Sequence, residues 1–236
     1  MNISAKVKKT VAVATVAAMG LTASAGTVAD ACGSAKIVFS GYSGATELVD
    51  FPALVRISEA KMPGIDLSTF RADGLDIRFF DADGNEIPHE IETWDPSGTS
   101  LVWVKVPHFT AATRVRLHWG VRPDAPASPA LDAKETWSGY AGVWHLDEDS
   151  GTAADATGHG LDGTPAGSQA ARMVATNDAV VGRARVNRDG GSNISTSRLE
   201  IPSYDDLKIG STFTASGFFK LNASTWPGSA TVGNYP

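Results

Sequence analysis

Short stretches in which apolar and polar residues alternate constrain the fold of this chain more than any other feature of the sequence. In residues 114–119, three apolar side chains alternate with two arginines and a histidine, and residues 51–58 repeat the pattern less strictly. Because successive side chains of a β-strand point to opposite faces, this period of two predicts strands with one buried face. The residues predicted to face the core are Phe51, Ala53, Val55, Ile57, Val115, Leu117 and Trp119.

Turn signals separate these stretches at short intervals. Pro63-Gly64, Asp83-Gly84 and Pro96-Ser97-Gly98 combine residues that favour tight turns. The chain has 24 glycines and only 19% charged residues, which suits a turn-rich β protein better than a helical one. Between residues 35 and 121 we predict about six strands, no long helix and a compact antiparallel β-sandwich.

A second β-rich region follows a stiff linker. Residues 122–136 contain three prolines and several small residues, and we predict a solvated linker there. Residues 137–236 again favour strands, so the sequence predicts an all-β chain with two antiparallel β-sandwiches in tandem. The stretches concerned are AGVWHLDE (141–148), VGRARVN (181–187), SRLEIP (197–202) and TFTASGFFKLNA (212–223), the last with Phe213, Ala215, Gly217, Phe219 and Leu221 on one face.

The N-terminal residues have the features of an export signal. Lysines at positions 6, 8 and 9 precede an apolar stretch, and Ala23-Ser24-Ala25 is a small-residue cleavage site. We predict a signal peptide over residues 1–25, with an alternative end at Ala31. The protein is then expected to be periplasmic, on the cell surface or extracellular, with no integral membrane segment after cleavage. An uncleaved membrane anchor is the alternative.

The single cysteine, Cys32, excludes an intramolecular disulfide. It directly follows the second cleavage site, which raises the alternative of a lipid-anchored cysteine. The residues before it are Ala29, Asp30 and Ala31, whereas a lipoprotein signal usually has Leu three residues before the cysteine and a small residue next. A free thiol near the mature N-terminus is the favoured interpretation.

Nucleic acids and nucleotides are not expected ligands. The net charge of −6 offers nothing to a phosphate backbone. Residues 158–163, GHGLDG, have the spacing G-x-G-x-x-G, and Asp178 follows at about the distance of a ribose-binding acid. However, Pro165 and Gly167 stand where a phosphate-binding helix would have to begin. The glycines therefore indicate a tight loop that requires positive φ.

Candidate catalytic and metal sites in the first region are also weak. Asp81, Asp83, Asn85 and Glu92 have EF-hand spacing, but Glu86 replaces the required glycine, so we predict a hairpin with an Asp83-Gly84 turn. Neither Glu90 and Glu92 nor the acids at 147–149 show a glycosidase spacing, and we predict that the acids at 147–149 are solvated. No catalytic residue is predicted. Trp103, Trp119 and Trp144 are expected in cores, whereas Trp94, Trp137 and Trp226 lie near turns, where aromatic rings could stack on sugars.

Three long stretches carry a resemblance to a family of secreted bacterial proteins. They are residues 39–59 (FSGYSGATELVDFPALVRISE), residues 73–107 (DGLDIRFFDADGNEIPHEIETWDPSGTSLVWVKVP) and residues 140–165 (YAGVWHLDEDSGTAADATGHGLDGTP). The first module of this family is a β-rich domain of unknown function, a type also found joined to proton-channel subunits of the MotA/TolQ/ExbB kind. The second resembles a laminin-G-like domain with the concanavalin A-like lectin/glucanase fold, and 213–221 resembles a core strand of it. No part of this sequence resembles a proton-channel subunit.

The resemblance implies a partial jelly roll and a calcium site. A concanavalin A-like domain usually needs about 150 residues to close two sheets, whereas 137–236 is shorter. The sequence is therefore either truncated or completed by a partner. In laminin-G-like domains an acidic loop often holds calcium, and the matching residues here are Asp155 and Asp162, with carbonyl oxygens near Gly158 and Gly160. Asx-turns are the alternative role for both aspartates.

The expected function follows from the same resemblance. We expect a non-catalytic extracytoplasmic module that binds a polysaccharide, a cell-surface glycan or another surface polymer, with calcium as the only suggested cofactor. The alternative is a structural or adhesive spacer without its own ligand. A fragment of a glycoside hydrolase is the third possibility.

Overall fold

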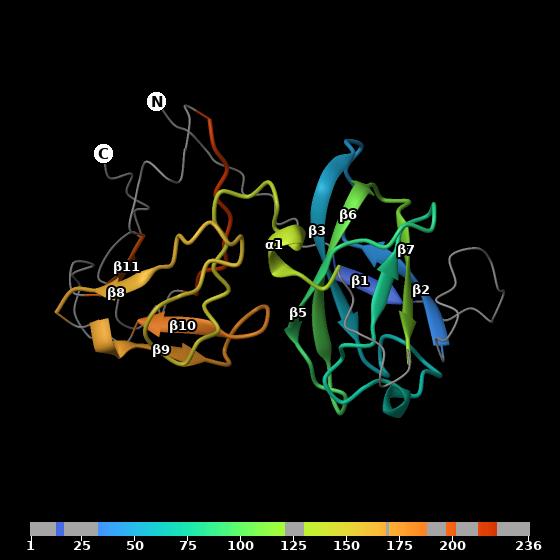
Figure 1. Ribbon diagram of the computed structural model, residues 1–236, viewed down its shortest axis with the longest axis horizontal. Coiled ribbons are helices and arrows are strands. Elements are labelled where there is room, and N and C mark those ends of the chain that lie inside the picture. Colours follow the sequence, from blue (N-terminus) through green and yellow to red (C-terminus); the bar gives the residue numbers. More distant parts are fainter. Residues whose placement is uncertain are drawn as a thin grey trace. The chain divides into compact units, whose positions relative to one another are not determined.

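The computed structural model describes residues 13–16, 33–120, 130–168, 170–187, 197–201 and 212–220. Their regular structure is almost all strand, so the predicted all-β class is confirmed. The chain divides into two compact units, Met1–Gly139 and Tyr140–Pro236 (Figure 1). Among the described residues, no helix has the length and apolar character needed to span a membrane.

The first unit is built on a seven-stranded sheet with the order β4-β7-β2-β1-β3-β6-β5. Its neighbouring strands are antiparallel, except that β1 is parallel to β3. The strands are β1 (Val13–Val16), β2 (Gly33–Ser40), β3 (Leu48–Ile57), β4 (Arg78–Phe80), β5 (His89–Thr93), β6 (Ser100–Phe109) and β7 (Arg114–Trp119). Two short helices accompany them, η1 (Leu67–Thr69) and α1 (Ala133–Thr136).

The core of the first unit joins the two halves of this sheet. Alternate side chains from β2, β4 and β7 belong to the same buried cluster as alternate side chains from β3 and β6. The halves β4-β7-β2 and β3-β6-β5 therefore face each other as the layers of a sandwich, and β1 lies where they join. Phe51, one of the predicted core residues, is partly buried and packs against this cluster. The other six are buried as expected: Ala53, Val55, Ile57, Val115, Leu117 and Trp119.

The predicted hairpin after β4 is confirmed. The N–H of Asp81 donates to the carbonyl oxygen of Asn85, and Ile87 N donates to Phe79 O at 2.9 Å. The carboxylate of Asp81 accepts the N–H groups of Asp83 and Asn85. The EF-hand pattern is thus a turn stabilised by its own first aspartate.

The first unit extends into the predicted linker. The N–H of His89 donates to Ala130 O at 2.9 Å, and α1 packs on β5 and β6. Trp137, which the sequence placed at the start of the second region, is 6% exposed and packs edge-to-face on Trp103, with ring centroids 5.4 Å apart. The unit boundary after Gly139 therefore differs from the predicted linker of 122–136, because a buried aromatic side chain anchors its C-terminal end.

The second unit contains two small antiparallel sheets in its described residues, β8 with β11 and β9 with β10. The strands predicted at 181–187 and 197–202 are confirmed, but residues 141–148 and 212–220 do not form strands. In the latter segment Phe219 is 90% exposed rather than in a core. The concanavalin A-like jelly roll stays a prediction. The elements are β8 (Thr164–Ala166), η2 (Ala170–Arg172), β9 (Met173–Thr176), β10 (Ala184–Asn187) and β11 (Arg198–Glu200).

The predicted signal peptide lies mostly outside the described residues, as do both cleavage sites, Cys32 and Trp226. The part that is described is β1, which comes from the apolar stretch of that segment.

Candidate functional site

Asp155 lies at the centre of the glycine-rich loop of the second unit and accepts hydrogen bonds on both carboxylate oxygens. Oδ1 accepts from the N–H groups of Val143 (3.2 Å) and Thr157 (3.1 Å). Oδ2 accepts from Leu161 N at 3.2 Å, and the Thr157 hydroxyl lies within 2.8 Å of both oxygens. Burial acts to raise the pKa of Asp155, but the hydrogen bonds from Thr157, Val143 and Leu161 together hold that pKa below its usual value.

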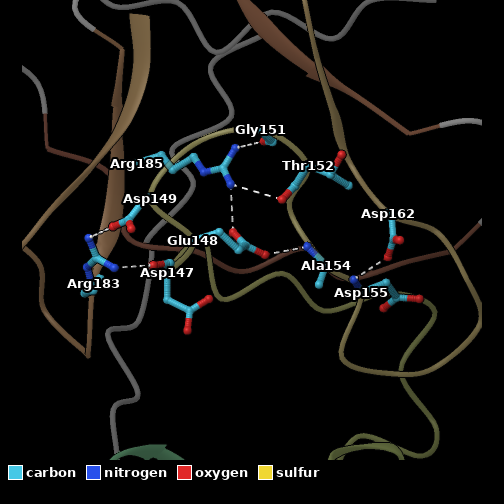
Figure 2. Close-up of polar contacts among 10 residues, drawn as sticks. All are labelled: Asp147, Glu148, Asp149, Gly151, Thr152, Ala154, Asp155, Asp162, Arg183 and Arg185. Carbon is cyan, nitrogen blue, oxygen red and sulfur yellow. Dashed lines mark hydrogen bonds and ion pairs between the residues drawn. The ribbon is translucent and has the colours of Figure 1, made fainter. Parts of the chain in front are cut away.

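The structure brings the two predicted calcium ligands together through a hydrogen bond. Asp162 Oδ1 accepts the N–H of Asp155 at 2.9 Å (Figure 2). The donors around Asp155 point their hydrogens at its carboxylate oxygens, so hydrogen bonds already use part of the acceptor capacity that a cation would need. Among the described residues, no three His, Cys, Asp or Glu side chains gather as a metal-binding group. The geometry fits the alternative prediction, in which Asp155 and Asp162 stabilise turns.

The glycines of this loop allow backbone conformations with positive φ. Gly158 and Gly160 have φ of 76° and 77°, and a Cβ on Gly160 would meet nothing within 4 Å. Left-handed backbone conformation, not close packing, therefore explains Gly160. Strand β8 follows the loop where a nucleotide-binding fold would require a helix, as the sequence predicted.

A network of acids and arginines tethers the neighbouring loop 147–154. Arg185 on β10 donates from Nη2 to Glu148 Oε2 at 2.8 Å and to Thr152 O at 3.2 Å, and from Nη1 to Gly151 O (Figure 2). The other oxygen of Glu148 accepts the N–H of Ala154 at 2.5 Å. Only 2% of the Arg185 side chain is exposed. The acids at 147–149 were predicted to be solvated, which holds for Asp149 at 88% exposure, whereas Glu148 is 28% exposed and pairs with a buried cation from a distant strand.

Arg183 makes a second tether that is much more exposed. It donates to Asp147 O at 2.8 Å and to Asp149 Oδ1 at 2.6 Å (Figure 2). Its side chain is 41% exposed and that of Asp149 is 88% exposed, so solvent screens this pair. The signal that could have found both arginines is their spacing, because residues two apart share a face in extended backbone, and Arg183 directly precedes β10.

Two carboxylates of the first unit accept hydrogen bonds from tryptophans. Trp103 Nε1 donates to Glu92 Oε2 at 2.8 Å, and Trp137 Nε1 donates to Glu90 Oε2. Glu90 and Trp103 are direct cross-strand partners on β5 and β6. Of the pair considered for glycoside hydrolysis, Glu90 therefore joins the residue after α1 to the sheet, whereas Glu92 links β5 to β6.

A polar groove lies among loops of the first unit. Residues 58–60, 66–68 and 96–99 line it, and we call it the hydroxyl groove. On one side Asp66 Oδ1 accepts from Ser68 N (2.9 Å) and Ser68 Oγ (2.6 Å). On the other side Asp95 Oδ1 accepts from Ser97 N (3.0 Å) and Ser97 Oγ (2.7 Å). Two Asp-x-Ser turns of the same design thus shape the groove, and the hydrogen bonds of Ser68 lower the pKa of Asp66.

Sequence reasoning did not find the hydroxyl groove, although its parts were visible. The turn at 96–98 was predicted, but the loop 66–68 belongs to no motif that was considered. Its signal is the repeated Asp-x-Ser sequence, which favours a side-chain-capped turn. Which turns lie side by side depends on the sheet topology, and a single sequence does not reveal that.

Two buried histidines offer no reactive site. His89 is fully buried against Phe79, and burial lowers its pKa to about 4, with Arg78 adding to the effect and the Ile87 carbonyl opposing it. His118 is also buried, and burial followed by the charge of Arg116 lowers its pKa. Both imidazoles are therefore neutral parts of the packing near pH 7.

Comparison with known proteins gives one match. Residues 73–159 match a family described as "Domain of unknown function (DUF2341)". The match supports the predicted domain of unknown function, but it runs past the predicted boundary at residue 121 and includes the Asp155 loop, which had been assigned to the laminin-G-like region. Neither curated proteins nor solved structures gave a match. From β4 to the Asp155 loop, the chain is therefore similar to a domain family whose function is unknown.

Proposed function

We propose that this chain is a non-catalytic, extracytoplasmic module that binds a glycan or another hydroxyl-rich surface polymer. The observation that carries the proposal is the hydroxyl groove, which is lined by four hydroxyl-bearing residues, Ser58, Ser68, Ser97 and Thr99, and by the acids Glu59 and Asp66. Groups of this kind are the hydrogen-bonding partners that sugar hydroxyls need. The groove is formed by loops held on a rigid sandwich, a common arrangement for binding sites.

The hydrogen bonds within the groove favour a neutral ligand. The hydroxyls of Ser68 and Ser97 donate to their own aspartates, so their remaining lone pairs can only accept. Asp66 uses Oδ1 for its turn, which leaves Oδ2 as a further acceptor. A groove of acceptors with two carboxylates suits a donor-rich polyol and repels phosphate or uronate groups.

The engagement of the other acids supports binding without hydrolysis. Glu90 and Glu92 accept indole N–H groups, and Glu148 is paired with buried Arg185. Glycoside hydrolysis requires two carboxyl groups on opposite sides of a bound sugar. These three are committed to contacts inside their units.

A structural spacer without its own ligand is the second candidate, and one observation favours it. Trp94, which could have stacked on a sugar, packs against Phe70 with ring centroids 5.9 Å apart and against Gly74. A Cβ on Gly74 would lie 2.4 Å from the indole, so the ring is wedged in place. The hydroxyl groove therefore lacks the help of this aromatic platform.

The test is a glycan array probed with the purified chain. We expect binding to neutral glycans, lost in Glu59→Gln and Asp66→Asn and kept in Glu135→Gln. Glu135 is a matched control because it is an exposed acid on α1, outside the groove. Equal binding by all three variants would place the ligand elsewhere, and no binding to any glycan would favour the spacer. Release of reducing sugar would instead reveal a hydrolase.

A further inference from the structure

Strand β1 occupies an unexpected place, because its residues come from the predicted signal peptide. Val13–Val16 pair antiparallel with β2, from Val13 opposite Ser40 to Val16 opposite Ile37. On its other side β1 is parallel to β3, with Val13 opposite Leu54. The same four residues are therefore expected to be removed on export and are found between two strands of the first unit.

The sheet keeps most of its pairing without β1. Residues 33–38 of β2 pair with β7, and β3 pairs with β6 from Leu48 to Ile57. Each half of the sandwich thus retains three strands, and one buried core joins the halves. In the described part of the chain, β1 is the strand that covers the facing edges of β2 and β3. Loss of β1 would leave two open strand edges beside each other, and such edges readily pair with another chain.

We propose that the gap between β2 and β3 is a strand-acceptor site, which in the exported protein takes an extended, uncharged, apolar segment of another polypeptide. The segment would run antiparallel to β2 and parallel to β3, as β1 does. Three of the residues opposite or beside β1 are apolar and buried, namely Ile37, Phe39 and Leu54, whereas Val38 is partly buried and Ser40 is exposed. A charged segment would lose its hydration there without a partner.

The occupant is a different polypeptide rather than a second copy of the mature chain. A copy processed at Ala25 or Ala31 no longer carries the Val-Ala-Thr-Val sequence that fits this gap. Strand addition of this kind draws its affinity from main-chain hydrogen bonds and its specificity from alternate side chains. The site is independent of the hydroxyl groove, so either proposal can fail without the other.

The first experiment uses the full chain with β1 disabled. In Ala14→Pro/Thr15→Pro, adjacent prolines remove one N–H donor toward β2 and one toward β3. We expect faster hydrogen exchange at Ile37–Ser40 and near Leu54, and unchanged exchange at the β3–β6 pairing. A peptide of residues 11–18 should restore the protection, and the same peptide carrying both prolines should not. Thr22→Pro/Ala23→Pro, with as many prolines outside β1, is the matched control.

Two results of this experiment would overturn the proposal. Unchanged exchange at residues 37–40 would mean that β1 does not cover this edge. Loss of protection across β3 and β6 as well would make β1 an obligatory part of the fold.

The second experiment does not depend on the prolines. The exported chain is purified, its N-terminus is sequenced, and fluorescence anisotropy measures its binding of the labelled 11–18 peptide. We expect the mature chain to begin after Ala25 or Ala31. It should bind the 11–18 peptide saturably and should not bind the same peptide carrying both prolines. A chain that still begins at Met1, or a processed chain that does not bind the peptide, would contradict the proposal.

Discussion

Arg185 and Glu148, 37 residues apart in the sequence, form an ion pair with 2.8 Å between Nη2 and Oε2. The guanidinium also binds the carbonyl oxygens of Gly151 and Thr152, so one buried side chain fixes three points of the loop. A buried ion pair adds little net stability, but removal of one partner leaves the rest uncompensated. The pair therefore determines where the loop lies more than how stable the unit is.

Arg185→Met should lower the free energy of unfolding of the second unit by about 3 kcal/mol, because Glu148 and two carbonyl groups lose their donor. Arg183→Met removes the same kind of side chain from an exposed pair, so its cost should stay below about 1 kcal/mol. Urea unfolding of both variants, with equal slopes, measures the difference. Equal losses would mean that the burial of Arg185 has no energetic consequence.

Leu117→Asp should cost several kcal/mol, on the order of 4, because it places an unpaired charge among the buried side chains of β7. Lys36→Asp provides the control, since Lys36 is exposed on the neighbouring strand opposite Arg116. We expect a change within about 0.5 kcal/mol for the control. Thermal unfolding checks both variants, and an unchanged midpoint in Leu117→Asp would contradict the strand-face assignment.

The sequence predicted the strands of the first unit well, because alternation directly reports one buried face. It does not report what happens to the other face. Leu54 is not among the residues predicted to face the core, yet it is buried at the register position opposite β1. For residues 141–148 the error is of another kind. Their pattern predicted a strand, but they form a loop, and their apolar side chains pack around that loop. The indole of Trp144, for example, donates to Leu161 O at 2.8 Å.

The candidate site was harder to predict for a physical reason. The proximity of Asp155 and Asp162 could be expected from the loop that contains both. Backbone N–H groups donate hydrogen bonds to the Asp155 carboxylate, and one of these donors belongs to Val143, 12 residues away. Every residue except proline carries such a donor, so the sequence does not identify which ones converge.

His89 should make the first unit sensitive to mild acid. Its pKa of about 4 in the folded chain lies below the ordinary 6.5, so the unfolded chain binds a proton first as the pH falls. Stability should therefore be complete above pH 6.5 and decline toward pH 4, by up to roughly 1.4 kcal/mol per pH unit and about 3 kcal/mol in total. His89→Leu should flatten this decline when unfolding is measured by denaturant at several pH values.

His108 is the matched control for that pH series. It is exposed, and the hydrogen bond and charge of Glu47 raise its pKa, so its contribution is present at low pH and lost as the pH rises. His108→Gln should therefore leave the decline between pH 6.5 and 4 in place. If His89→Leu retains the same decline, another group titrates there.

The Asp155 loop should be stable without calcium. Asp155→Asn replaces an acceptor oxygen by an amide that faces N–H donors, and we expect a loss of about 2 to 3 kcal/mol. Asp162→Asn is the matched control, because Asp162 accepts the N–H of Asp155 on one oxygen and an asparagine keeps an oxygen that can turn toward this donor, so the cost should be near 0.5 kcal/mol.

Thermal unfolding in EDTA and in millimolar calcium separates this interpretation from the calcium site expected from the resemblance. A bound ion would stabilise the folded chain by RT ln(1 + [L]/Kd), so a true site would raise the midpoint as calcium increases. Because the Asp155 oxygens already accept from Val143, Thr157 and Leu161, we expect identical midpoints in both solutions. If calcium raises the midpoint of the unchanged protein but not that of Asp155→Asn or Asp162→Asn, the loop rearranges to expose both carboxylates to the ion.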